Sequence, residues 1–199
     1  MVLPPDLSLH HSLVFHLHAP LNAIGERKMT FLFRSLVFIL FLGLLLLPGM
    51  VTAAPSAEII VDEVNCYLED AIDAANNGTT VGGCTGSSGP DTIILDVAEV
   101  YLFYTLPTIT SEITIDGRGN AITGDGFEGV FFVAFSGNLT LDNVTISGGS
   151  ASKGGAVNNE GQLTVINSTF FNNSASNGGG AIYSAAKITV TNSTFYNNT

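Results

Sequence analysis

Few residues after position 53 could carry out acid–base chemistry. Asp116-Gly117-Arg118 brings a carboxylate close to a guanidinium, and carbohydrate-cleaving enzymes need charged groups of this kind, usually as a carboxylate pair. Asp-Gly is also a strong turn dipeptide, and no second carboxylate stands at a fixed interval beside it. The pattern therefore favours a turn, and we assign no catalytic residue.

Histidine, the commonest general base and metal ligand, occurs only near the start of the chain. The four histidines are His10, His11, His16 and His18. A metal-binding tract is one interpretation, but these histidines have no cysteine or carboxylate partners at metal-ligand spacing. We favour the other interpretation, in which residues 1–28 are a mis-assigned leader and Met29 is the true start. We therefore predict no metal and no cofactor.

The only two cysteines are Cys66 and Cys84. An even number of cysteines in an exported chain indicates a disulfide, which would stabilise the fold by about 3 kcal/mol. A metal site would need two more ligands, and a redox pair is normally more closely spaced. We therefore predict a disulfide between Cys66 and Cys84.

Residues 29–53 have the pattern of a secretory signal peptide. Arg27, Lys28 and Arg34 supply positive charge, residues 35–47 are apolar, and Val51-Thr52-Ala53 ends in small residues before Ala54. The alternative is an uncleaved anchor, but the apolar run is short of the ~20 residues that cross a bilayer. We expect that this signal exports the protein, which is then either secreted or located at the cell surface or outer membrane.

The charge of the chain excludes one class of partner. The whole chain has a formal charge of −11, and only three basic residues stand against fifteen acidic ones after residue 53. A nucleic-acid binder needs clustered lysine and arginine, so we expect no nucleic-acid partner.

Residues 54–91 are expected to form an N-terminal cap that contains Cys66 and Cys84. Leu68, Ala71 and Ile72 recur at helical spacing, and Asn77-Gly78 is a helix C-terminal signal. We predict a short helix over 68–76 that covers the open first coil of the structure that follows.

Residues 92–199 contain a repeat. A ten-residue block recurs after 24 and then 25 residues, at 137–146, 161–170 and 186–195. One unit cannot bury its own apolar face, but parallel stacking of units can. The expected columns are Leu139, Leu163 and Ile188; Leu141, Val165 and Val190; Ile146, Phe170 and Phe195; and Val157 with Ile182.

These features predict an all-β fold, a right-handed parallel β-helix of the pectate-lyase-like architecture with a short N-terminal capping helix. Asn143, Asn167 and Asn192 are expected to form an inner asparagine ladder at a bend. A leucine-rich repeat would need a helix in each unit, and a β-sandwich would not repeat a near-identical decamer.

Two resemblances follow from these residues. The segment from Cys66 to Asn76 resembles the CSLREA motif of exported bacterial β-helix proteins, although Tyr67 and Glu69-Asp70 depart from it. The repeats resemble the GGAI and FxxN motifs of chlamydial polymorphic outer membrane proteins. The motif residues are Gly154-Gly155-Ala156-Val157, Gly179-Gly180-Ala181-Ile182, Phe170 with Asn173, and Phe195 with Asn198.

The second resemblance implies surface display and adhesion. We therefore expect a non-catalytic protein that binds an extracellular ligand, either a protein or a glycan. The alternative is a carbohydrate-active β-helix enzyme, a lyase or a glycosidase, whose catalytic coils are missing from this chain. Because the repeat calls for another block after Phe195, we also expect a solenoid truncated at its C-terminus that self-associates through its open last coil.

Overall fold

A computed structural model describes residues 53–126 and 128–199 of the 199-residue chain. The predicted leader (1–28) and all but the last residue of the predicted signal peptide (29–53) lie outside the described residues. In the part that is described, no helix has the length and apolar character needed to cross a membrane.

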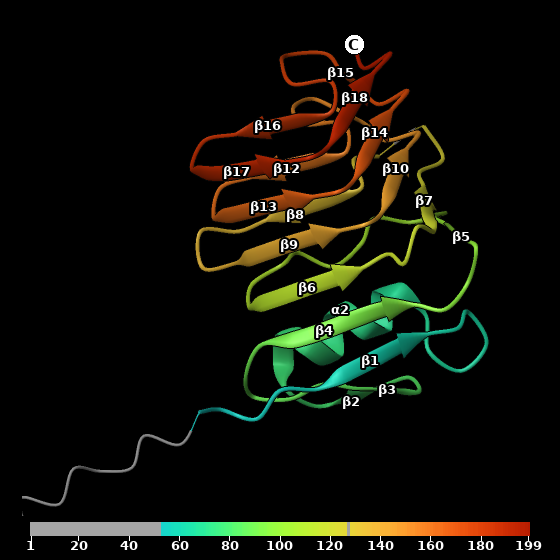
Figure 1. Cartoon of the computed structure of the whole chain (residues 1–199), viewed down its shortest axis with the longest axis vertical. Coiled ribbons are helices and arrows are strands. Elements are labelled where there is room, and N and C mark those ends of the chain that lie inside the picture. The colour runs from blue at the N-terminus through green and yellow to red at the C-terminus, as the bar shows by residue number, and fades with distance from the viewer. Residues whose placement is uncertain (1–52, 127) are drawn as a thin grey trace, which may run out of the picture. The chain divides into compact units, whose positions relative to one another are not determined.

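Apart from one antiparallel hairpin in the cap, strands from successive coils stack in parallel, so that each pairs with the strand one coil away (Figure 1). The first sheet contains, in order, β1 (Glu58–Val61), β4 (Asp91–Leu95), β6 (Glu112–Asp116), β9 (Asn138–Asp142), β13 (Gln162–Ile166) and β17 (Lys187–Thr191). Alternate residues face the interior: in β9, Leu139 and Leu141 are buried while Thr140 is half-buried.

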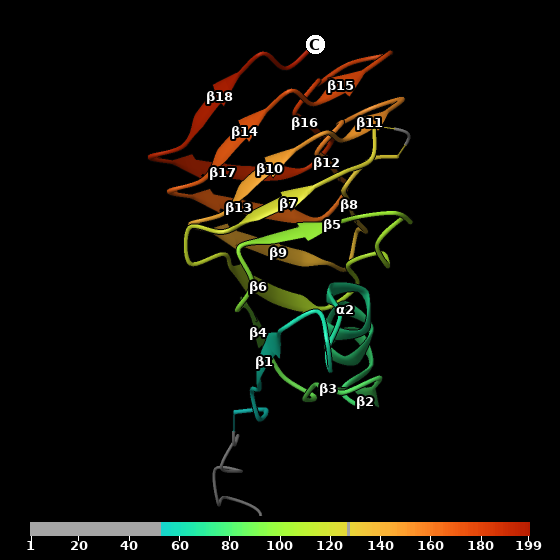
Figure 2. The ribbon, with the colours of Figure 1, turned by 90° about the vertical axis from the view of Figure 1, so that its right-hand side faces the viewer.

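Two further faces close the coil (Figure 2). The second sheet contains β5 (Glu99–Tyr101), β7 (Ala121–Thr123), β10 (Thr145–Ser147), β14 (Thr169–Phe171) and β18 (Thr194–Tyr196). The third contains β8 (Phe131–Val133), β12 (Val157–Asn159) and β16 (Ile182–Ser184). A two-stranded sheet, β11 (Ser150–Ala151) with β15 (Ser174–Ala175), lies between the second and third faces in sequence.

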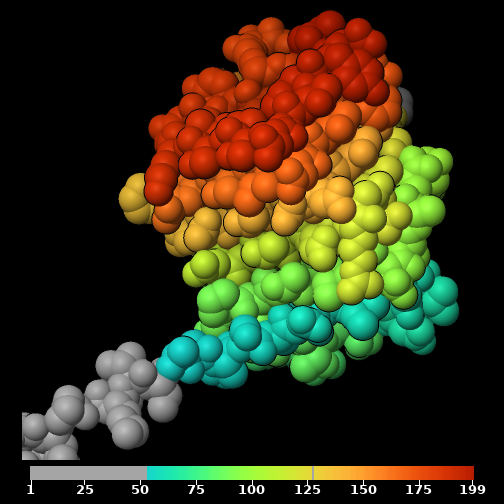
Figure 3. Space-filling view, viewed as in Figure 1, coloured from blue at the N-terminus to red at the C-terminus, as the bar shows by residue number. Residues whose placement is uncertain are grey.

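The coil is right-handed, as the sequence predicted. In Figure 1 the strands of the first sheet run from left to right across the front, the second sheet lies at the right, and the chain returns behind before it enters the next coil above. A path that advances in this way is a right-handed parallel β-helix. The space-filling view in Figure 3 shows the coils as bands stacked in sequence order.

The strand register confirms the four predicted columns. Leu163 pairs with Leu139 and Ile188 in the first sheet, as Val165 does with Leu141 and Val190. The other two columns also hold: Ile146, Phe170 and Phe195 in the second sheet, and Val157 with Ile182 in the third. The rings of Phe170 and Phe195 stack with their centroids 4.9 Å apart.

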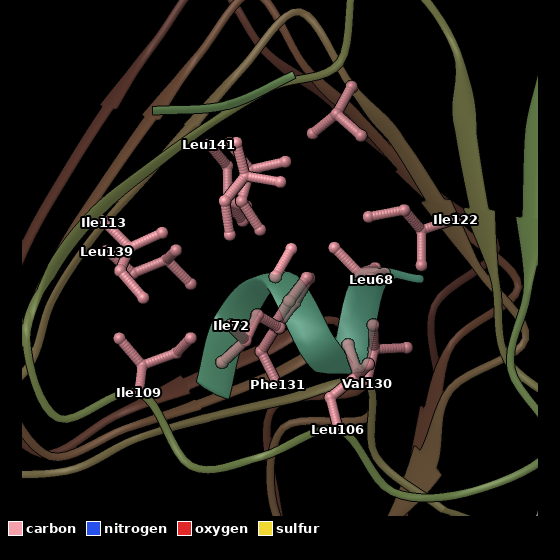
Figure 4. Close-up of a cluster of buried hydrophobic side chains, with 14 of the residues drawn as sticks. Leu68, Ile72, Leu106, Ile109, Ile113, Ile122, Val130, Phe131, Leu139 and Leu141 are labelled. Atoms are coloured by element: carbon pink, nitrogen blue, oxygen red, sulfur yellow. The ribbon is translucent and has the colours of Figure 1, made fainter. Parts of the chain in front are cut away.

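The core fills the space enclosed by the three faces. Figure 4 looks along this space and shows Ile113, Leu139 and Ile122 pointing inward from different strands, together with Leu68 and Ile72 of the helix. All five side chains are buried. Burial of apolar area at this scale is the main favourable term in folding, so the stack depends on each coil covering the next.

The predicted cap helix is α2 (Leu68–Asn77), and it ends at Gly78 in the left-handed conformation. Its buried face packs against β1, β4 and β6, where the first coils have no third-sheet strand. The predicted disulfide between Cys66 and Cys84 is present, with the two Cα atoms 5.0 Å apart. Cys84 lies in the hairpin of β2 (Thr80–Val81) and β3 (Cys84–Thr85), so the bond ties this hairpin to the start of the helix.

The structure places β1 inside the segment that we assigned to the cap. Glu58 to Val61 pair in parallel with Thr92 to Leu95, so the first sheet begins before the helix rather than at residue 92. This strand has no copy of the repeated decamer, which is why periodicity did not reveal it.

The inner ladder predicted for Asn143, Asn167 and Asn192 is wrong. All three side chains are exposed, and their backbones are left-handed, with φ of 50°, 50° and 49°. Asparagine tolerates this conformation better than most other residues, so its role here is to bend the chain between the first and second sheets.

An inner asparagine ladder lies at the next bend and consists of Asn173, which is buried, and Asn198, which is half-buried; both belong to FxxN motifs. Asn173 Nδ2 donates to Asn198 Oδ1 at 3.1 Å and to the carbonyl of Ile146 at 3.1 Å, and Asn173 Oδ1 accepts from Gly149 N at 3.0 Å. These amides satisfy backbone groups at a corner where no strand partner can do so.

Candidate functional site

A groove runs over the outer side of the third sheet. It has a volume of about 520 Å³. One wall is the segment that precedes β8 together with Thr105, Leu106 and Thr108, the floor is β8 and β12, and the opposite wall is the turn from Ala151 to Gly154.

Three side chains from successive coils form an outward-facing column in this sheet. Phe132, Asn158 and Tyr183 occupy the middle position of β8, β12 and β16, and the register pairs Asn158 with both of the others. In β8 and β12 the residues on either side of the middle position are buried, so Phe132 and Asn158 must face outward. The column therefore presents two aromatic rings with an amide between them, and Phe132 and Asn158 both line the groove.

The first GGAI-like motif shapes the wall of the groove. Gly154 has φ of 62°, and a Cβ atom there would lie 2.0 Å from the carbonyl oxygen of Val157. A Cβ at Gly155 would lie 2.3 Å from the carbonyl oxygen of Gly180, and Ala156 is fully buried. The motif lets one coil pack tightly on the next and contributes no reactive group.

The second motif repeats this arrangement one coil later. Gly179 has φ of 67°, and a Cβ at Gly180 would lie 2.4 Å from the carbonyl oxygen of Thr199. Ala181 is buried and Ile182 is half-buried. Both motifs thus place the residue that follows them, Asn158 or Tyr183, on the outer surface.

Lys153 brings the positive charge of the site. Its Nζ lies 4.5 Å from the centre of the Tyr183 ring and 3.4 Å from the Tyr183 hydroxyl. A cation at this distance from an aromatic face is attracted by the ring. Glu128 also lines the groove and is the carboxylate among its lining residues.

Asn158 carries a hydrogen-bonding group that the described residues leave unused. Its Oδ1 is buried and has no hydrogen-bond partner among residues 53–126 and 128–199. A buried acceptor that lacks a donor carries a desolvation cost.

The structure gives Asp116 and Arg118 the structural role that the sequence favoured. Arg118 N donates to Asp116 Oδ1 at 3.0 Å in a tight turn, with φ of 51° at Arg118. Its guanidinium lies 3.7 Å from Asp96 and 4.0 Å from Asp116, and none of these three residues lines the groove. Across the two described segments, no three histidine, cysteine or acidic side chains gather in a way that could hold a metal ion.

Sequence reasoning did not identify Phe132, Asn158 or Tyr183 as a site. A signal was available, because aligning the two GGAI-like blocks puts Asn158 and Tyr183 at the same outward position. The groove itself depends on how residues 105–108 pack beside β8, and that contact has no counterpart in the repeat.

Comparison of the chain with protein families, with curated proteins and with solved structures finds no match.

Proposed function

We propose that the protein is exported to the cell surface or the extracellular space and binds a neutral glycan in the groove over the third sheet. Export is supported by the signal-peptide pattern of residues 29–53 and by the Cys66–Cys84 disulfide, since disulfides persist in oxidising compartments. Surface display and adhesion are also what the resemblance of the repeats implies.

The observation that carries the choice of ligand is the column of Phe132, Asn158 and Tyr183. Aromatic rings give flat apolar surfaces for the C–H faces of sugar rings, and binding sites commonly combine such surfaces with a few polar groups that fix orientation. Asn158, half-buried between the two rings, supplies the polar group of the column. Successive coils repeat at about 4.8 Å, so a linear oligosaccharide can lie along the column.

The charge distribution favours a neutral glycan over an acidic one. The chain after residue 53 has fifteen acidic and three basic residues, so it repels a polyanion at long range. Lys153 is already engaged with the ring of Tyr183, which makes it a positioning residue rather than a counter-ion for a uronic acid.

The test is binding of the purified protein to an array of linear neutral oligosaccharides, followed by titration with the tightest binder. Tyr183→Ala and Phe132→Ala should each weaken binding by roughly three- to tenfold. Phe135→Ala is the matched control, because Phe135 is 90% exposed and belongs neither to the groove nor to the column of Phe132, Asn158 and Tyr183. Equal affinity in all three variants would contradict the proposal.

The same incubations address the enzymatic alternative. If the protein only binds, the oligosaccharide is recovered at its original length after prolonged incubation. Shortened or unsaturated products that disappear with Glu128→Gln would instead support a carbohydrate-active enzyme, since Glu128 is the one carboxylate that lines the groove among the described residues.

A further inference from the structure

A second pocket adjoins the groove at Thr105 and Leu106, lies toward the N-terminal end of the solenoid and has a volume of about 340 Å³. Four aromatic residues line it: Tyr67, Tyr101, Phe103 and Tyr104. Their exposed fractions are 42%, 59%, 75% and 85%, so these rings are not part of the core. Aromatic side chains that gather at one exposed site mark a binding surface more often than scattered ones do.

One wall of this pocket is held rigidly by the cap. Glu63, Tyr67 and Glu69 lie around the start of α2, next to the disulfide at Cys66. The Asp62 carboxylate accepts hydrogen bonds from the backbone of the following residues, and Glu63 Oε1 accepts from Leu68 N at 3.3 Å. These hydrogen bonds constrain the loop between β1 and α2.

The facing wall is the segment that follows β5, which passes beside α2 in Figure 2. Leu106 is buried and Leu102 packs against the core, so they anchor the segment at two points. Phe103 and Tyr104 lie between these anchors and project to the surface. Tyr101 is hydrogen-bonded to Glu99.

The pocket is acidic as well as aromatic. Glu63 and Glu69 line it, and no lysine, arginine or histidine does. Within the described segments the ion pairs involve Arg118 alone, so neither glutamate is neutralised by a cation there. Burial, and then the charges of Glu69 and Asp62, raise the pKa of Glu63, as expected for a carboxylate that lacks a positive partner.

We propose that this pocket binds a quaternary ammonium group. The positive charge of such a cation is spread over its N-methyl groups and is attracted to the faces of aromatic rings, and aromatic cages are a common way in which proteins recognise it. A quaternary ammonium has no N–H to donate, so rings suit it better than hydrogen-bond acceptors do. The volume accommodates the headgroup with part of the chain that carries it. This inference is independent of the glycan proposal, because the two pockets share only Thr105 and Leu106.

The experiment is calorimetric titration of the purified protein with choline chloride, and in parallel with 3,3-dimethyl-1-butanol, its uncharged isostere. We expect saturable binding of choline and at least tenfold weaker binding of the isostere, since only the charge differs between the two probes. Equal binding of both, or no saturable binding of choline, would overturn the proposal.

Two variants locate the site. Tyr104→Ala removes an exposed ring, and Glu69→Gln removes a charge from an exposed helix position, so neither change disturbs the core. Each should weaken choline binding by roughly three- to tenfold. Phe135→Ala and Tyr183→Ala are the controls and should leave it unchanged. Loss of choline binding in these controls but not in the pocket variants would place the ligand elsewhere and refute the proposal.

Vesicles distinguish the source of the group. Co-sedimentation with phosphatidylcholine vesicles, reduced by Tyr104→Ala, would identify a lipid headgroup. Binding of free choline without vesicle binding would identify a soluble ligand, which supports the same site. Equal sedimentation with phosphatidylglycerol vesicles, combined with no response to free choline, would contradict recognition of the ammonium group.

Discussion

Asn173 and Asn198 lie one above the other inside the second bend of consecutive coils, with Asn173 Nδ2 3.1 Å from Asn198 Oδ1. Asn198 Oδ1 also accepts from Asn173 N at 3.1 Å, and Asn198 Nδ2 donates to the carbonyl of Phe170 at 2.9 Å. The side-chain amide of each coil thus makes hydrogen bonds to backbone groups of the preceding coil. The ladder therefore connects consecutive coils in addition to stabilising the bend.

Substitution of Asn173 tests this ladder. Asn173→Ala leaves Gly149 N and the carbonyl of Ile146 without their side-chain partner in a buried bend, so it should lower the free energy of unfolding by about 2–4 kcal/mol. Asn167→Gly is the control, because Asn167 is exposed and glycine accepts its left-handed backbone; its effect should stay within about 0.5 kcal/mol. If denaturant unfolding gave the same loss of free energy of unfolding for both variants, the ladder would have no special role in stability.

The disulfide gives a second prediction. Thiol titration of the denatured, unreduced protein should find no free thiol. Replacing Cys66 and Cys84 by serine together should lower the free energy of unfolding by about 3 kcal/mol, because the 18-residue loop is then open in the unfolded chain. Two titratable thiols would contradict the assignment.

The repeat made most of the fold predictable. Each of the three near-identical decamers alternates apolar and polar residues, and Leu139, Leu163 and Ile188 are the equivalent apolar position in each. Stacking the blocks with their apolar residues inward allows only one register. The ladder was misplaced because asparagine suits two roles, a left-handed bend and a buried amide stack, and residue type alone does not separate Asn167 from Asn173. Neither pocket was foreseen, because each is bounded by residues 101–108, which lie outside the repeated block.

The Asp62 turn makes stability depend on pH. Hydrogen bonds from the side chain and backbone of Asn65, and from the backbones of Val64 and Cys66, hold the pKa of Asp62 well below its ordinary value of 3.8. Because the folded state favours the ionised form, Asp62 stabilises the protein above pH 3.8, and that contribution is lost as the pH falls further.

Comparison with Asp62→Asn isolates this effect. The difference in melting temperature between the two proteins should be constant from pH 7 to about pH 5 and should shrink below pH 3.8, because the neutral amide does not titrate. A difference that stays constant down to pH 2 would mean that the ionised carboxylate contributes nothing to folding.

The coil formed by β17 and β18 exposes apolar side chains that the other coils bury. Ile188, Val190 and Phe195 are 39%, 45% and 42% exposed. An uncovered strand edge of this kind pairs readily with another chain, so we predict that the 199-residue chain self-associates through it. Val190→Lys should reduce the sedimentation-derived mass, while Thr189→Lys, on the opposite face of the same strand, should not. A monomer at high concentration would contradict this prediction.

The most direct test of the account is to map the glycan site by ¹⁵N-resolved NMR during titration with the tightest oligosaccharide from the array. If the groove over the third sheet is the binding site, the backbone signals of Phe132, Asn158 and Tyr183 and of the turn at Gly154 should shift together with one dissociation constant. Shifts confined to α2 and β5, or spread evenly over the surface, would contradict it.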